Sequence, residues 1–337
     1  MSLFKNKNMQ AAGISLLLTL MTIPAVLAAP SDYDDVVVFG ASFSDSGNGF
    51  VLMSNPEVFG IDESCELGTS ANVPPYDSVD ELFVPETPYS IGGHNYTNGA
   101  TWVETLVKGT GLSGSVKPAL RNVGTQAKNY AVGGARALEF DCRFNLSNQL
   151  AMYLDDFSSS STNTLFIIDV GGNDLRDIMA GAVDPDQVPI IISNIAGTIT
   201  TLYAHGARQF LLVNVADFGQ VPSVQILDKI YPEFNFPVVA NQLASGFNQG
   251  LLQLQTTLNN LPGADIRVFD LYSLLDSMLD DPSNYGLTDT AVPCITPNLA
   301  PYICKKPKEF LFWDGLHVTK TVHEVMASQA AEVLMKP

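Results

Sequence analysis

The stretch VVVFGASFSDSGN, residues 36–48, joins a β-branched run to a dense group of small polar residues. The three valines predict a buried strand. The end of that strand is rich in small polar residues and glycine: residues 40–48 include three serines, an aspartate and two glycines. A plain tight turn needs only one or two such residues. This density therefore raises the question of whether one of the serines carries out chemistry.

Similar apolar runs recur along the chain. They occupy residues 36–40, 164–172, 210–219 and 266–272, with a shorter candidate at 129–132. Near-continuous apolar runs are typical of parallel strands that are covered on both faces. Helix-like segments lie between and after them, at residues 99–109, 184–205, 237–261 and 319–335. This alternation predicts an α/β domain with a central parallel sheet and helices on both sides.

Two regions, residues 51–98 and 276–310, lack this periodicity, and we expect them to form loop insertions beside a site. The chain has four cysteines, and an even number in an exported protein suggests two disulfides. Three pairings are possible. Cys294 and Cys304 bracket a short Pro-containing loop and are the favoured pair, which leaves Cys65 with Cys142. A metal site is the alternative, but no cysteine has a nearby cysteine or histidine at ligand spacing.

The first 28 residues predict a secretory signal peptide. Lys5 and Lys7 precede a long apolar stretch, which Pro24 interrupts and Val26-Leu27-Ala28 ends. Cleavage there leaves one domain, residues 29–337, in a secreted protein of the periplasm or the extracellular space. The alternative is an uncleaved membrane anchor, since the apolar stretch is nearly long enough to span a bilayer.

The chain is acidic, with a formal net charge of −18 that becomes more negative when the two leader lysines are removed. Such a charge repels polyphosphates and argues against nucleic-acid binding. Only 15% of the residues are charged, so a large part of the surface is polar but uncharged. The composition is that of a soluble exported protein.

Polar residues collect where strands of the expected sheet end. Ser42 follows the first strand, Gly133 and Gly134 follow the 129–132 segment, and Asn173 follows the strand that begins at residue 164. In open α/β sheets, ligands bind beyond these carboxyl ends. Each group alone has a structural explanation, as a turn or as close packing. Together they supply the parts of an acyl-transfer site.

A serine nucleophile needs an adjacent base, and histidine is the natural one near neutral pH. The chain has four histidines, His94, His205, His317 and His323. Only His317 has a carboxylate, Asp314, three residues earlier, which is close enough in a turn to accept its Nδ1 proton. Donors for a negative oxygen would be the N–H of Ser42, if this residue begins a helix, the N–H of Gly134 and the amide of Asn173.

These groups lie in four blocks that resemble those of the GDSL, or SGNH, hydrolases. The blocks are FGASFSDSGN at 39–48, NYAVGGA at 129–135, GGND at 171–174 and DGLH at 314–317, in family order over nearly the whole mature chain. The resemblance implies a three-layer α/β/α, flavodoxin-like fold. It also implies a Ser42-His317-Asp314 triad and an oxyanion hole of Ser42, Gly134 and Asn173, without metal or cofactor. Gly133 is an alternative to Gly134, because the block can be aligned one residue over.

The first block departs from the family pattern at two positions. Ala41 stands where the family usually has Asp, and Phe43 where it has Leu. Loss of the aspartate is expected to loosen the loop around Ser42 or to lower the rate. Ser44 and Ser46 are expected to hydrogen-bond within the loop or to cap the following helix.

The resemblance implies a secreted serine esterase. A lipid acyl ester is the favoured substrate, as in the phospholipase, lysophospholipase and haemolysin branch, with transient contact to a membrane surface and with acyl transfer as an accompanying activity. A carbohydrate acetylesterase is the enzymatic alternative. A non-catalytic surface or ligand-binding protein on the same fold is the alternative from another class, and Ala41 is its main support. The sequence leaves the oligomeric state open.

Overall fold

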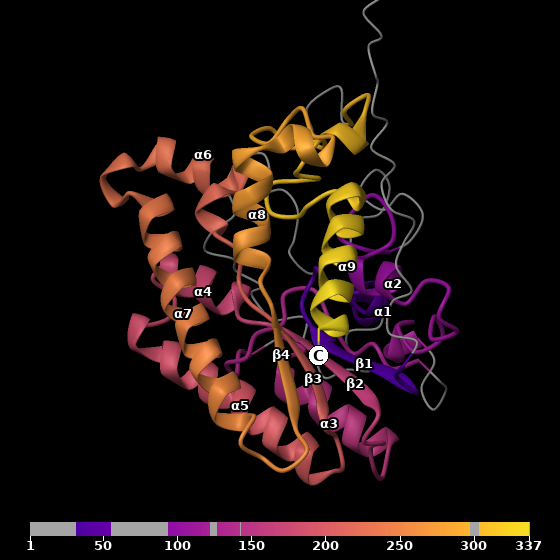
Figure 1. Cartoon of the computed structure of the whole chain (residues 1–337). Helices are drawn as coiled ribbons and strands as arrows, with labels where there is room; N and C mark the ends of the chain where they lie inside the picture. Colours follow the sequence, from indigo (N-terminus) through magenta and orange to yellow (C-terminus); the bar gives the residue numbers. More distant parts are fainter. Residues whose placement is uncertain (1–31, 55–93, 122–126, 142, 297–302, 337) are drawn as a thin grey trace, which may run out of the picture.

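The computed structural model describes residues 32–54, 94–121, 127–141, 143–296 and 303–336 of the 337-residue chain (Figure 1). The predicted signal peptide lies outside the described residues, and so do Cys65 and Cys142. Within the described ranges, no helix combines the length and the apolar character needed to cross a membrane.

A parallel sheet forms the centre of the molecule, and its strands are hydrogen-bonded in chain order. They are β1 (Asp35–Gly40), β2 (Thr164–Asp169), β3 (Gln209–Val213) and β4 (Asp265–Phe269). The apolar residues of β1, β2 and β3 are almost fully buried, which confirms the prediction from their near-continuous apolar runs. β1 ends with its apolar run at Gly40, whereas β2, β3 and β4 end a few residues before their runs do.

The 129–132 segment extends this sheet beyond β1. The Tyr130 N–H donates to the Val38 carbonyl at 2.8 Å, and the Val132 N–H donates to the Gly40 carbonyl at 3.1 Å, in parallel pairing. With this segment as second in the chain, the spatial order is 2-1-3-4-5, the flavodoxin-like order that the family resemblance implies. The order reverses between β1 and β2, which is where such folds bind ligands.

Helices flank the sheet (Figure 1). They are α1 (Asn48–Ser54), α2 (Trp102–Leu106), α3 (Leu146–Asp156), α4 (Gly172–Met179), α5 (Val188–Ala204), α6 (Pro222–Ile230), α7 (Phe236–Leu258), α8 (Leu271–Asp280) and α9 (Lys320–Met335). On one side α9 packs on α2 and against β4. On the other side α3 packs next to β1, and α5 packs on α7. The architecture is α/β with covered faces, as predicted.

Local sequence explains the clearest helices. In α5, Ile191, Ile195 and Ile199 repeat every four residues and are buried on one face. In α2, the Thr101 side chain accepts from the Glu104 N–H, and the Glu104 carboxylate accepts from the Thr101 N–H. This reciprocal capping box satisfies two donors at the start of a helix that is only five residues long.

Several short helices were not predicted. They are α3, α4, α6 and α8, and α8 extends into the region that was expected to be irregular from residue 276. The predicted disulfide between Cys294 and Cys304 is present in that region. The Cys294 N–H donates to Phe312 and the Ile295 N–H donates to Trp313, so the disulfide loop is attached to the segment just before Asp314.

Candidate active site

Ser42 lies in a tight turn directly after β1. The Ser44 N–H donates to the Ala41 carbonyl at 3.1 Å, which closes the turn around Ser42. Ser42 does not begin a helix, because the helix of this loop, α1, starts only at Asn48. Ser42 is partly exposed, and it makes no hydrogen bond with any residue in the described ranges. Its N–H is therefore available as a hydrogen-bond donor even though Ser42 is not at the start of a helix.

Asp45 holds the rest of this loop in place. Its Oδ1 accepts from the N–H groups of Gly47 and Asn48, both at 2.7 Å. Its Oδ2 accepts from Gly49 at 2.9 Å and from Gly133 at 2.8 Å. Burial raises the pKa of Asp45 to about 6, although the four N–H donors act in the opposite direction. Asp45 therefore caps α1 and joins the nucleophile loop to the glycine block.

Ser44 and Ser46 bond outside their own loop, contrary to expectation. The Ser44 hydroxyl donates to Asp169 at the end of β2 and accepts from the Trp102 indole at 3.0 Å. The Ser46 hydroxyl donates to the Val116 carbonyl at 2.8 Å. Ser44 and Ser46 are thus buried, and their hydrogen bonds connect the loop to distant segments. Ser42 makes no such bond.

The glycine block follows the segment beside β1. The Gly133 N–H is engaged by Asp45, and the Tyr96 ring fills the space that a Cβ on Gly133 would need. Gly134 has φ +78°, a left-handed conformation that favours glycine. Its N–H donates to no other residue in the described ranges. Of the two glycines, only Gly134 has an N–H that is not already engaged.

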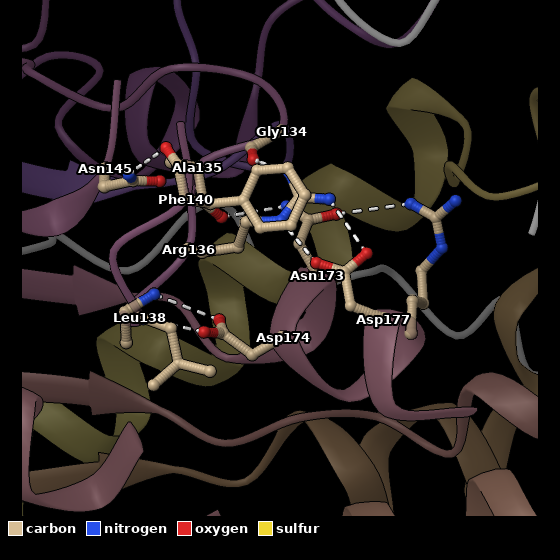
Figure 2. A network of polar contacts seen from close by, with 11 residues as sticks. Gly134, Ala135, Arg136, Leu138, Phe140, Asn145, Asn173, Asp174 and Asp177 are labelled. Atoms are coloured by element: carbon tan, nitrogen blue, oxygen red, sulfur yellow. Dashed lines mark hydrogen bonds and ion pairs between the residues drawn. The ribbon is translucent and has the colours of Figure 1, made fainter. Parts of the chain in front are cut away.

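Asn173 lies in the first turn of α4, beyond the end of β2. Its Nδ2 donates to the Ala135 carbonyl at 3.0 Å, and its Oδ1 accepts from Arg176 at 3.2 Å (Figure 2). These two bonds fix the orientation of the amide. The second hydrogen of Nδ2 is left for another acceptor.

Asp314 and His317 lie in one turn just before α9. The Asp314 Oδ2 is 2.8 Å from the His317 Nδ1, and its Oδ1 accepts from the N–H groups of Leu316 and His317, both at 2.7 Å. Burial acts to raise the pKa of Asp314. The charge of His317 and these hydrogen bonds outweigh it, so the pKa lies below its ordinary value. The carboxylate is thus held ionised beside the imidazole.

Aromatic rings surround the His317 imidazole. The Tyr96 ring centroid is 5.1 Å away and the Phe43 centroid is 5.9 Å away. Phe43 also contacts the buried His323, with centroids 6.0 Å apart. The phenylalanine in place of the usual leucine therefore packs between the two histidines.

One pocket brings the candidate groups together. Ser42, Asn173 and His317 line it. Most of the other lining residues are apolar, and those of α8, α9 and the 3₁₀ turn Phe218–Gln220 are among them. It has about 960 Å³ of empty space, its open mouth included. Gly134 is not among the lining residues. Asp314 does not line the pocket, but it is hydrogen-bonded to two lining residues, Leu316 and His317. In the described part of the chain, no three His, Cys, Asp or Glu side chains converge to hold a metal ion.

Comparison with known proteins identifies the family. A model of the family described as GDSL-like Lipase/Acylhydrolase matches residues 36–330. The chain belongs to this GDSL family. This confirms the resemblance found in the sequence, and it places the chain among ester-hydrolysing enzymes.

Two plant proteins and one solved structure resemble this GDSL protein. GDSL esterase/lipase At1g71250 of Arabidopsis thaliana is 25% identical over 97% of this chain and 93% of its own length. GDSL esterase/lipase LIP-4 of Arabidopsis thaliana is 26% identical over 59% of this chain and 64% of its own length. A crystal structure from Parabacteroides merdae ATCC 43184, described as a GDSL-like lipase, covers 92% of this chain and 98% of its own at 15% identity, with a TM-score of 0.39.

One carboxylate of this GDSL site was not singled out from the sequence. Asp169, at the end of β2, lines the pocket beside Ser42 and accepts from Ser44. Burial raises its pKa to about 6, although hydrogen bonds from Ser44 and Trp102 oppose this. The Ala41 N–H donates to the Asp169 carbonyl at 3.0 Å, which ties the turn to β2 at the position where the family usually has aspartate. A charged residue ending an apolar strand was the signal that could have revealed it.

Proposed function

We propose that this protein is a secreted serine esterase that hydrolyses lipid acyl esters. Ser42 is the nucleophile, His317 the general base and Asp314 the residue that orients His317. The observation that supports this most is that Ser42 and His317 line the same pocket, whose other lining residues are mostly apolar. Ser42 Oγ and His317 are not hydrogen-bonded to one another, and catalytic hydrogen bonds of this kind often tighten only when substrate binds.

The reaction proceeds in two halves. The Ser42 Oγ attacks the ester carbonyl carbon while His317 Nε2 takes the hydroxyl proton, and the carbonyl electron pair moves onto the oxygen. The tetrahedral intermediate then expels the alcohol, which receives the proton from His317. Water attacks the acyl-enzyme in the same way and releases the fatty acid and Ser42. The Asp314 carboxylate keeps the Nδ1 proton in place throughout.

The oxyanion hole consists of the N–H groups of Ser42 and Gly134 and the side-chain amide of Asn173. The engagement of the Gly133 N–H by Asp45 supports Gly134 over Gly133. The unused hydrogen of Asn173 Nδ2 and the unengaged N–H of Ser42 support their roles. All three donors are neutral, so none is lost by titration.

A long acyl chain suits the cavity better than an acetyl group does. Leu274, Leu275 and Met278 of α8 line it together with Val322 and Met326 of α9. Apolar walls of this extent stabilise a chain of methylene groups but make no polar contact with a sugar. This favours a lipase or lysophospholipase over the carbohydrate acetylesterase.

Three measurements test this function. Ser42→Ala is expected to fold normally and to lose ester turnover and covalent labelling by a fluorophosphonate. Wild-type protein that is not labelled at Ser42 would instead favour the non-catalytic binding protein. Turnover of p-nitrophenyl esters is expected to rise from acetate to medium and long chains, and lysophospholipid is expected to be hydrolysed. A strong preference for acetate would favour the acetylesterase.

Contact with a lipid surface is supported by exposed apolar side chains at the junction of α6 and α7. Ile230, Tyr231, Phe234 and Val238 are each 46–57% exposed, and we call them the apolar tip. Val221, at the start of the same α6, lines the pocket. α6 has nine residues and is about 14 Å long, so the tip begins one helix length from this lining residue. Aromatic side chains of this kind are favoured at lipid–water interfaces.

Vesicle binding tests the apolar tip. Phe234→Ser is expected to weaken sedimentation with phosphatidylcholine vesicles several-fold and to leave turnover of a soluble short-chain ester unchanged. Val292→Ser is the matched control, because Val292 is equally exposed at 53% and is distant in sequence from the tip. Equal losses in the two variants would show that the tip has no special part in lipid contact.

Secretion is supported by the leader sequence and by the disulfide between Cys294 and Cys304, since disulfides persist in oxidising compartments. Mature protein is expected outside the cytoplasm, with a new N-terminus at Ala29. N-terminal sequencing of the exported protein checks this. Recovery of the full-length chain in a membrane fraction would favour the uncleaved anchor.

A further inference from the structure

A buried ion pair lies behind the proposed oxyanion hole. The side chains of Arg136 and Asp177 are 1% and 7% exposed. The Arg136 Nε donates to Asp177 Oδ2 at 2.6 Å, and its Nη2 donates to Oδ1 at 3.0 Å. The Phe140 ring covers the guanidinium, with 4.6 Å between the ring centroid and Cζ (Figure 2). The pair is thus fully enclosed, and Arg136 does not line the pocket.

The pair joins the two segments that carry the candidate donors. Arg136 belongs to the glycine-block loop, whereas Asp177 belongs to α4, which also carries Asn173. Two further contacts connect the same segments. The Asp174 carboxylate accepts from the N–H groups of Ala137 and Leu138, and the Asn173 amide donates to Ala135 (Figure 2).

Arg136 also reaches Gly134 directly. Its Nη1 donates to the Gly134 carbonyl, while Nε and Nη2 donate to Asp177. Gly134 has a left-handed backbone and no side chain to restrain it. The guanidinium therefore restrains the backbone of Gly134. Because it is also bonded to Asp177, it fixes the position of Gly134 relative to α4.

Stability alone does not explain such a pair. Replacing a buried ion pair by apolar residues of similar volume is often neutral or stabilising, because desolvation of the charges offsets their attraction. A bidentate Arg–Asp pair does, however, fix geometry. Here the pair fixes the position of the glycine-block loop relative to α4.

We propose that Arg136 and Asp177 are positioning residues that hold the Gly134 N–H and the Asn173 amide at the spacing an oxyanion requires. This rests on the proposed function. Donors in an oxyanion hole act by being fixed before the charge develops, so a looser spacing lowers the rate of the chemical step. Substrate binding in the apolar pocket does not depend on the pair.

The test is the double variant Arg136→Met/Asp177→Leu, which removes both charges and leaves neither one unpaired. It is expected to fold with a thermal midpoint close to that of the wild type. With a long-chain p-nitrophenyl ester, kcat is expected to fall at least tenfold while KM stays within about twofold. Labelling by a fluorophosphonate is expected to slow by a similar factor.

The chain offers a matched control in Arg267 and Asp265 of β4. Arg267 also makes a bidentate contact to an aspartate, and its Nη1 donates to the backbone carbonyls of Val333 and Leu334. Asp265 is the first residue of β4, at the end of the sheet opposite to the pocket. Arg267→Met/Asp265→Leu is therefore expected to leave kcat and KM unchanged.

A folded Arg136→Met/Asp177→Leu protein with wild-type kcat would overturn the proposal, and so would an equal fall in kcat in the control. Arg136→Lys gives a second measurement, because it keeps the buried charge but loses the fork. Its kcat is expected between those of the wild type and the double variant, and an unchanged kcat overturns the proposal even if the double variant does not fold. Wild-type turnover that survives Ser42→Ala would instead refute the proposed function, independently of the ion pair.

Discussion

Asp314 shows how one side chain can orient a catalytic residue. It accepts from the His317 imidazole and from two backbone N–H groups of the turn that carries this histidine. The ring and its own backbone are thus fixed by the same carboxylate. The three-residue spacing makes this contact local, and for that reason it could be predicted from the sequence.

Asp314→Asn is expected to lower kcat by a factor of 10³ to 10⁴ with little change in KM. An amide at this position donates to His317 Nδ1 rather than accepting from it, which leaves the imidazole in the tautomer that cannot take the Ser42 proton. Steady-state kinetics with a soluble ester measure this, and circular dichroism checks the fold. A fall of less than tenfold would contradict the role of Asp314.

Asp169 makes the stability of the protein depend on pH. Its pKa is about 6 in the folded state, above the value near 4 of an unfolded chain. The unfolded state therefore releases this proton first. The contribution of Asp169 to the free energy of unfolding is fully present below pH 4. It is lost as the pH rises from 4 through 6, which lowers the free energy of unfolding by about 2 to 3 kcal/mol.

Asp169→Asn is expected to remove this dependence while keeping an acceptor for the Ser44 hydroxyl. Urea unfolding of both proteins between pH 4.5 and pH 7 measures it. The stability of the variant relative to the wild type is expected to rise by about 2 kcal/mol over this range. Parallel profiles of the two proteins would show that Asp169 does not titrate there.

The hydrogen-bond partners of the buried carboxylates could not be assigned from the sequence. Asp45 and Gly133 are 88 positions apart, and Ser44 and Asp169 are 125 positions apart. Spacing carries no information about such contacts, which exist only because the sheet brings β1, β2 and the 129–132 segment together. The roles of Ser44 and Ser46 were misjudged for the same reason, since their partners lie in other segments.

At the scale of elements, α8 and α9 decide what the pocket can hold. Met278 and Met326 are fully buried, yet they line the cavity from opposite helices. Methionine fills irregular space and adapts its shape easily. These two side chains are therefore suited to bound an acyl chain of variable length.

Met326→Trp is expected to shift the preferred p-nitrophenyl ester to a shorter chain, and Met326→Ala to a longer one, because the first fills the cavity and the second enlarges it. Both changes are expected mainly in KM for the long esters, with kcat for the shortest ester within a few-fold of the wild type. An identical chain-length profile for the three proteins would exclude this cavity as the acyl site.

The disulfide supports the turn of Asp314 from outside the sheet. Cys294 and Cys304 close a loop with a sequence separation of ten, and the backbone of Cys294 and Ile295 bonds to Phe312 and Trp313. In the chain-entropy model, a loop of this length stabilises the folded state by about 3 kcal/mol.

Cys294→Ser/Cys304→Ser is expected to lower the free energy of unfolding by about 2 to 3 kcal/mol and to lower the temperature at which activity is lost. The loss of activity is expected to begin before global unfolding, because the freed loop is attached to the segment that leads to Asp314. Urea unfolding and residual turnover after heating measure the two effects. An unchanged unfolding midpoint would show that the loop is held by its other contacts.

Long elements were easier to predict than short ones. The apolar faces of α5, α7 and α9 extend over several turns, so periodicity reveals them. In contrast, α4 begins within a few residues of the end of β2, and its first turn, Gly172-Asn173-Asp174, also suits a plain loop. Such a helix forms because tertiary packing stabilises it, which propensity alone does not show.

At the scale of the whole molecule, the net charge of −18 governs which surfaces the protein approaches. Like charges repel over about one Debye length, roughly 10 Å at 0.1 M salt. The apolar tip is flanked by Asp228, Lys229 and Glu233, so it offers no excess of positive charge to reverse this.

Turnover of the same ester is therefore expected to be slower in anionic vesicles than in phosphatidylcholine vesicles at low salt. The difference is expected to shrink towards none as salt rises to about 1 M, where the Debye length falls to about 3 Å. Vesicle assays over a salt series measure this. A preference for anionic vesicles would point to a cationic patch that the described residues do not reveal.

The global topology could be predicted because several independent features of the sequence indicate the same arrangement. Several apolar runs, the helical segments between them and the four motif blocks agree on one α/β arrangement, so an error at one element does not change it. The 129–132 segment illustrates the limit. Its pairing with β1 completes the 2-1-3-4-5 order, but its four residues alone do not distinguish a strand from a loop.

The path of the chain also sets when the protein can become reactive. The loop after β1 is translated first among the parts of the site, and the turn of Asp314 and His317 follows only after β4. With the proposed roles, a nascent chain on the ribosome carries a serine without its base. Growing chains would then be harmless to the lipids of the cell that makes them, and hydrolytic capacity would arise only when a late segment joins an early one.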